Sequence, residues 1–178
     1  MWITIGIIVV IVVILGFLFW RNKKTKNGVV PVIDLNQYAG IWYENARLPV
    51  SYQEGCKNST ARYTLRPDNT LGVINKCELD GRIVEVRGIA IPNNSTIDPN
   101  TKILKPGRLK VVFENSPVSG DYNILYIDHD YQYSIVGTPD KKSLWILARM
   151  EKLSNDIYRD LVERAKKMGY NVNALIKN

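Results

Sequence analysis

Short runs of strand-forming residues alternate with turn-forming sequences between residues 41 and 150. This pattern restricts the fold more than any other feature of the chain. The runs are rich in β-branched and aromatic residues, which is typical of strands. Turn sequences such as Arg66-Pro67-Asp68-Asn69 and Asp80-Gly81 separate them at hairpin spacing. The eight predicted strands cover residues 41–46, 59–66, 71–79, 82–91, 108–114, 121–128, 131–137 and 143–150.

Eight consecutive strands favour an antiparallel meander that closes on itself, because closure removes two exposed sheet edges. A barrel of eight strands has room for one small ligand. We therefore predict an all-β, eight-stranded antiparallel up-and-down barrel. One helix should follow and pack on its outside, with Ser154 as N-cap, Asp156 in the first turn, Gly169 at the end, and an apolar stripe of Ile157, Leu161, Ala165 and Met168.

The register of the hairpin through residues 66–70 follows from its turn. Leu65 should lie opposite Leu71, Tyr63 opposite Val73, and Ala61 opposite Asn75, all on one face of the sheet. The same alternation divides the last strand into two faces. One face carries Trp145, Leu147 and Arg149, and the other carries Leu144, Ile146 and Ala148, which could meet the helix.

An uncharged apolar segment at residues 2–20 precedes this domain, and as a helix it would be roughly 28 Å long, enough to cross a bilayer. Trp2 and Trp20 flank it, and four basic residues follow within residues 21–26. We predict a single transmembrane helix at 2–20, a basic juxtamembrane linker at 21–37 and the barrel domain at 38–178.

A cleaved signal peptide is the alternative for this segment, although a basic n-region and a small-residue cleavage site are missing. A lipid-modified cysteine is not expected, because the first cysteine is Cys56. The side of the membrane stays undecided: the basic cluster favours the cytoplasm, whereas the two cysteines give a slight lean to an extracytoplasmic domain.

The charge distribution argues against nucleic acid as a partner. The net charge is +7, but Arg21, Lys23, Lys24 and Lys26 supply four of the positive charges and leave about +3 for the rest. The sequence contains no motif with metal-ligand or phosphate-binding spacing, so we expect no metal, cofactor or catalytic residue. Asp128, His129 and Asp130 are interpreted as a solvated turn.

Three motifs, in order, resemble the lipocalin family, specifically its branch of bacterial lipocalins and apolipoprotein D. They are Gly40-Ile41-Trp42-Tyr43, the turn around Tyr126-Ile127-Asp128-His129-Asp130-Tyr131, and Leu144-Trp145-Ile146-Leu147-Ala148-Arg149. The similarity covers about residues 38–178. It implies that Gly40, Trp42 and Arg149 form a structural motif, in which the arginine packs across the indole at the barrel floor.

The resemblance also implies a ligand site lined by Tyr63, Asn75, Tyr122 and Trp145. Neighbouring inward candidates are Val73, Leu109, Val111, Phe113, Ile124 and Tyr126. Such walls suit an apolar ligand with a polar head, such as a fatty acid or lysophospholipid, and Asn75 should mark the polar end. Two alternatives remain: a protein-interaction barrel filled by its own side chains, and a thiol-dependent lipid isomerase.

Cys56 and Cys77 are the only cysteines, and related bacterial lipocalins resemble this chain in having a pair here. The hairpin register places Cys77 opposite Ser59, so regular strands would hold the two cysteines too far apart. A curl of the chain at Glu54-Gly55 could bring them within bonding distance. A disulfide is therefore an expectation, with reduced thiols as the alternative.

Overall fold

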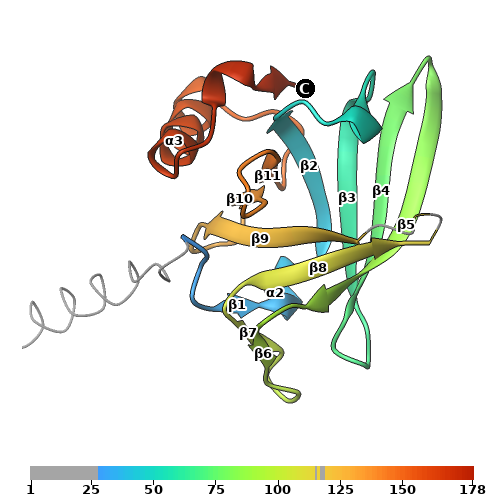
Figure 1. The fold of residues 1–178 in the computed structure, drawn as a ribbon, viewed down its shortest axis with the longest axis vertical. Helices are drawn as coiled ribbons and strands as arrows, with labels where there is room; N and C mark the ends of the chain where they lie inside the picture. Colours follow the sequence, from blue (N-terminus) through green and yellow to red (C-terminus); the bar gives the residue numbers. More distant parts are fainter. Residues whose placement is uncertain (1–27, 115, 117–118) are drawn as a thin grey trace, which may run out of the picture.

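The computed structural model describes residues 28–114, 116 and 119–178 and shows a closed antiparallel barrel (Figure 1). Each strand pairs with the next along the chain, and the last pairs with the first, so the predicted eight-stranded meander is confirmed. The strands of the barrel are β2 (Gly40–Arg47), β3 (Lys57–Leu65), β4 (Leu71–Leu79), β5 (Arg82–Pro92), β8 (Arg108–Phe113), β9 (Ser119–Ile127), β10 (Tyr133–Gly137) and β11 (Leu144–Ala148).

The β3–β4 hairpin has the register that its turn predicts. Leu65 pairs with Leu71, Tyr63 with Val73, and Ala61 with Asn75. At the other end of β4, Asp80 and Gly81 both have positive φ, of 50° and 72°, which matches the twist that two-residue hairpins require.

Helix α3 (Asn155–Lys167) lies outside the barrel, beside β2, β10 and β11 (Figure 1). The Ser154 hydroxyl accepts a hydrogen bond from the Ile157 amide, and Gly169 follows the helix with φ of +87°, so both predicted ends are confirmed. The helix packs into an apolar layer that we call the outer cluster. Its fully or nearly buried members are Val29, Ala46, Leu48, Leu125, Ile135, Leu144, Ile146, Leu161, Ala165 and Tyr170.

A small second sheet and a short helix cover one end of the barrel, which we call the closed end. The sheet consists of β1 (Ile33–Asp34), β7 (Ile103–Lys105) and β6 (Thr96–Ile97), and the helix is α2 (Leu35–Tyr38). Val29, Ile33 and Leu35 are fully buried, although the sequence places them in the linker. The folded domain therefore begins earlier than residue 38.

The remaining short elements are η1 (Ser51–Gln53) between β2 and β3, and η2 (Val172–Ala174) with β12 (Ile176–Lys177) after α3. Strand β12 pairs with the last two residues of β2, Ala46 and Arg47. No helix within residues 28–114, 116 and 119–178 is both long and apolar enough to span a bilayer. The predicted span at 2–20 and the basic residues 21–26 lie outside the described residues.

Candidate ligand-binding site

The inner face of the barrel carries a second apolar layer, the inner cluster. Seven of the eight predicted ligand-lining residues lie on this face. Tyr63, Val73, Tyr122 and Ile124 belong to the cluster, Phe113 and Trp145 pack against it, and Asn75 pairs with Ala61, which also packs against it. Leu109 and Val111, the two further inward candidates, are members as well. The alternation of each strand is therefore sufficient to place these side chains.

The prediction for Tyr126 is wrong. Its ring belongs to the outer layer, where the Arg164 guanidinium lies 4.5 Å from the ring centroid. The cause is a β-bulge in β9: Val136 pairs with Ile124 and Ile135 with Tyr126, which leaves Leu125 as an extra residue. The extra residue shifts the alternation by one and turns Tyr126 outward.

Three tyrosines meet at the closed end of the interior. The Tyr122 hydroxyl lies 2.6 Å from the Tyr38 hydroxyl and accepts a hydrogen bond of 2.9 Å from Tyr63. Burial raises the pKa of Tyr38 to about 12 and also raises the pKa values of Tyr63 and Tyr122, so all three are neutral phenols at physiological pH. Tyr63 and Tyr122, two of the predicted lining residues, are therefore hydrogen-bonded to each other through their hydroxyl groups.

The opposite end of the barrel, which bears η1 and the β4–β5 turn, is open to solvent on its inner face. Val84 and Val86 pair with Cys77 and Asn75 and therefore point inward. They nevertheless remain 40% and 45% exposed. The inner face of this stretch of β5 is therefore accessible to solvent, and we call this end of the barrel the open end.

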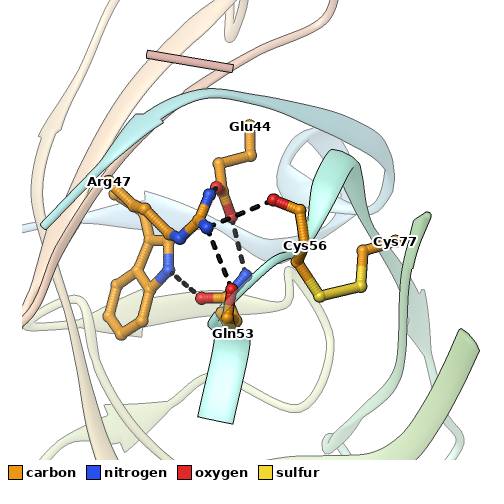
Figure 2. The surroundings of a disulfide bond; sticks show 6 residues. Glu44, Arg47, Gln53, Cys56 and Cys77 are labelled. Atoms are coloured by element: carbon orange, nitrogen blue, oxygen red, sulfur yellow. Dashed lines mark hydrogen bonds and ion pairs between the residues drawn. A yellow bond between two sulfur atoms is a disulfide. The ribbon is translucent and has the colours of Figure 1, made fainter. Parts of the chain in front are cut away.

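A buried ion pair lies on the inner face near the open end. Arg47 Nη1 is 2.8 Å from Glu44 Oε1, and both side chains are almost fully buried. Gln53 from η1 joins the pair: its amide nitrogen donates to Glu44 Oε2, and its amide oxygen accepts from the Trp145 indole N–H, each at 2.9 Å. Figure 2 shows Gln53 below the ion pair, with the disulfide to one side. We call Glu44, Arg47 and Gln53 the polar cluster.

The predicted disulfide is present. Cys56 and Cys77 are bonded, with their Cα atoms 5.5 Å apart (Figure 2). A β-bulge in β3 contributes, because Lys57 pairs with Glu78 but Thr60 pairs with Lys76, so one residue of β4 opposes two of β3. Asn58 in this bulge has φ of 51°, and Gly55 has φ of 75° at the curl the sequence suggested. With both sulfurs bonded, a thiol-dependent isomerase has no nucleophile.

The Arg149 side chain lies across the Trp42 ring as the resemblance implies, with its guanidinium carbon 3.9 Å from the ring centroid. Its partners are carbonyl oxygens of Gln37, Tyr38, Ala39, Ile41 and Tyr131. Gly40 has φ of +104°, and a Cβ there would lie 3.0 Å from Arg149 Nη1. Arg149 thus contacts both Trp42 and the chain around Gly40.

Comparisons with known proteins agree with this architecture. A family model described as a lipocalin-like domain matches residues 33–178. The chain belongs to the lipocalin family. It is 43% identical over 150 residues to lipocalin R877 of Acanthamoeba polyphaga mimivirus, covering 82% of this chain and 84% of that protein.

A further relative and a solved structure of similar fold extend the comparison. It is 35% identical over 150 residues to the outer membrane lipoprotein Blc of Citrobacter freundii, covering 83% of this chain and 80% of that one. Its fold matches lobster apocrustacyanin A1 with a TM-score of 0.64 and 19% identity, covering 87% and 92% of the two chains. Lipocalins are in general binding or transport proteins.

Sequence reasoning missed the polar cluster of this lipocalin, although it placed Asn75 on the inner face. The alternation counted from Trp42 predicts that Glu44 points inward. A carboxylate on an inner face needs a polar partner, so this residue could have indicated a buried polar site. Arg47 gives no such signal, because a bulge in β2 intervenes: Ala46 pairs with Ile146, but Glu44 pairs with Leu147. The extra residue, Asn45, turns Arg47 inward beside Glu44.

The described part of the chain holds no group of three His, Cys, Asp or Glu side chains that could bind a metal ion. Asp128 Oδ1 accepts hydrogen bonds from the amides of Gln132 and Tyr133 and so shapes the turn that contains His129. This is the role that the sequence predicts for the turn.

Proposed function

We propose that this protein is a membrane-tethered lipocalin that binds, and stores or transfers, a small amphiphile such as a fatty acid or a lysophospholipid. The observation that carries the proposal is the solvent exposure of inward-facing Val84 and Val86, because an apolar inner face that solvent reaches is also accessible to an acyl chain. The deeper inner face continues as the aliphatic and aromatic inner cluster.

The membrane part of the proposal rests on the sequence. Residues 2–20 are apolar and uncharged, and a relative is named an outer membrane lipoprotein. A transmembrane helix and a lipid anchor would have the same effect, since either holds a binding domain close to acyl chains and raises its effective concentration there.

Binding of a fluorescent fatty-acid probe to residues 28–178 tests the proposal. Trp145 packs against the inner cluster and donates its indole N–H to Gln53, so Trp145→Ala should weaken probe binding about tenfold, or about 1.4 kcal/mol. The matched control is Tyr126→Ala, which removes an aromatic side chain from the outer face of the same wall. Its affinity for the probe should stay within about twofold of the unaltered protein.

A broad lipid panel decides between binding and the protein-interaction alternative. Displacement of the probe by at least one class of single-chain lipid supports the proposal. If no lipid binds to the folded protein, the carrier function is wrong.

A further inference from the structure

Three buried polar atoms of the described residues lack a hydrogen-bond partner: Arg47 Nε, Ser59 Oγ and Asn75 Oδ1. Arg47 is only 3% exposed to solvent, and Ser59 is 5% exposed. An unpaired buried polar group costs free energy, so three of them in one molecule indicate a missing partner.

All three residues lie on the inner face, on the side of the barrel formed by β2, β3 and β4. Arg47 pairs with Trp145, which packs against the inner cluster. Asn75 pairs with Ala61, and Ser59 lies two residues before Ala61 on the same face of β3. The Arg47 guanidinium also donates to the Cys56 carbonyl, which places it over the start of β3 (Figure 2). The missing partner therefore lies inside the barrel near its open end.

The charge of this region is already balanced. Glu44 Oε1 accepts from Arg47 and Glu44 Oε2 accepts from Gln53, so both carboxylate oxygens have a partner within the polar cluster. Arg47 Nη2 donates to the carbonyls of Gln53 and Cys56, whereas the buried Nε–H has no partner. A carboxylate that entered here would be a second anion beside a neutralised arginine, and a buried charge without its own partner is strongly disfavoured.

We propose that the polar cluster, with Ser59 and Asn75, is the headgroup site of this lipocalin and selects a head with no net charge. The head accepts a hydrogen bond from Arg47 Nε–H and donates one to Asn75 Oδ1, while Ser59 Oγ serves either role. Uncharged glycerol heads and zwitterionic heads share this chemistry, and an ionised fatty acid does not. This inference rests on the proposed lipid-binding function and specifies its ligand class.

The test compares three photoreactive lipids of equal chain length with a diazirine in the acyl chain: a monoacylglycerol, a lysophosphatidylethanolamine and a fatty acid. The full chain is held in phosphatidylcholine nanodiscs at neutral pH, and labelling of peptides from β4 and β8 is quantified by mass spectrometry. At least one neutral-head probe should reach half-maximal labelling at a concentration about tenfold below that of the fatty acid. The first two probes separate uncharged from zwitterionic heads.

Glu44→Gln tests the electrostatic reason. With the carboxylate removed, Arg47 carries an unmatched charge that a fatty-acid carboxylate can neutralise, so the preference should shrink at least fivefold or invert. An unchanged preference in a folded Glu44→Gln protein would contradict the charge argument.

Ser59→Ala and Asn75→Leu keep the inference testable if Glu44→Gln does not fold. Both remove an atom that has no partner in the described structure, so neither should lower the thermal midpoint, yet each should weaken labelling by the preferred probe about fivefold. A purely structural role would give the reverse: lower stability with unchanged labelling.

The outcomes separate the two proposals. Fatty-acid labelling equal to or stronger than that of both neutral-head probes overturns the headgroup assignment and leaves the carrier function intact. Absence of labelling of barrel peptides by all three probes overturns both.

Discussion

The Arg149 guanidinium stacks on the Trp42 ring, 3.9 Å from the ring centroid, and donates hydrogen bonds to carbonyl oxygens at the end of helix α2 and just after it. Its hydrogen bonds to the carbonyls of Gln37, Ala39 and Ile41 are 2.7 to 2.8 Å long. One side chain at the end of β11 thereby fixes the helix that closes the barrel. Arginine suits this place because its planar fork presents several donors in one plane.

Arg149→Lys should destabilise the domain by about 3 kcal/mol, because an ammonium group lacks the planar fork of donors that reaches this set of carbonyls and the Trp42 ring. Urea denaturation followed by circular dichroism measures the change. Arg159→Lys is the control, since Arg159 forms an exposed ion pair with Asp156 on α3 and should change stability by about 0.5 kcal/mol or less. Equal effects of the two substitutions would contradict the structural role of Arg149.

Gly40→Ala should cost about 2 kcal/mol. Gly40 has φ of +104°, and an added Cβ would lie 3.0 Å from Arg149 Nη1. Gly120→Ala is the matched control in β9, because a Cβ there meets nothing within 4 Å and φ lies outside the positive region. A shift of the thermal midpoint for Gly40→Ala alone is the expected result.

The tyrosine trio predicts a specific sensitivity to alkali. Burial raises the pKa of Tyr38 from 10.0 to about 12, so the folded state keeps its proton after the unfolded chain has released it. Stability is therefore unaffected by this group below pH 10 and falls as pH rises from 10 to about 12. The loss for Tyr38 alone is about 2 to 3 kcal/mol at the upper limit.

Urea midpoints measured between pH 8 and pH 11 check this prediction, with phenolate absorbance as a direct readout. Tyr122→Phe removes one titrating hydroxyl of the trio, so its midpoint should fall less steeply with pH than that of the unaltered protein. Parallel slopes for the two proteins would show that the trio does not cause the alkaline loss.

Reduction of the Cys56–Cys77 bond should lower stability by roughly 3 kcal/mol, because the bond closes a loop with a sequence separation of 21 residues. It should also loosen the η1 segment, since Cys56 anchors the end of the loop that carries Gln53. Hydrogen exchange with and without reductant measures both effects. Amides of α3 serve as the internal reference, and unchanged exchange across residues 50–56 would refute the link.

Local patterns were sufficient for most of the barrel wall. The turn at residues 66–70 determines the Leu65–Leu71 pairing, and each further pair follows from the pleat, which is why Asn75 could be placed on the inner face. Bulges are the reason that other positions could not be placed. Tyr126 and Arg47 both lie beyond an extra residue, Leu125 or Asn45, and one inserted residue leaves no trace in an alternation of apolar and polar side chains.

The small sheet that covers the closed end escaped prediction for a different reason. Strand β1 has two residues and pairs with β7, far away along the chain. A strand this short shows no period, and its partner cannot be inferred from local sequence. The burial of Ile33 and Leu35 is therefore a property of the assembled end of the barrel.

The inner and outer apolar clusters have no residue in common, although the wall between them is a single strand thick. Along β11, Trp145 and Leu147 serve one cluster while Leu144 and Ile146 serve the other. Substitutions in the inner cluster can therefore leave the outer cluster, on which helix α3 packs, unchanged. A barrel with this separation can acquire a different ligand specificity, through evolution or protein engineering, while its fold stays the same.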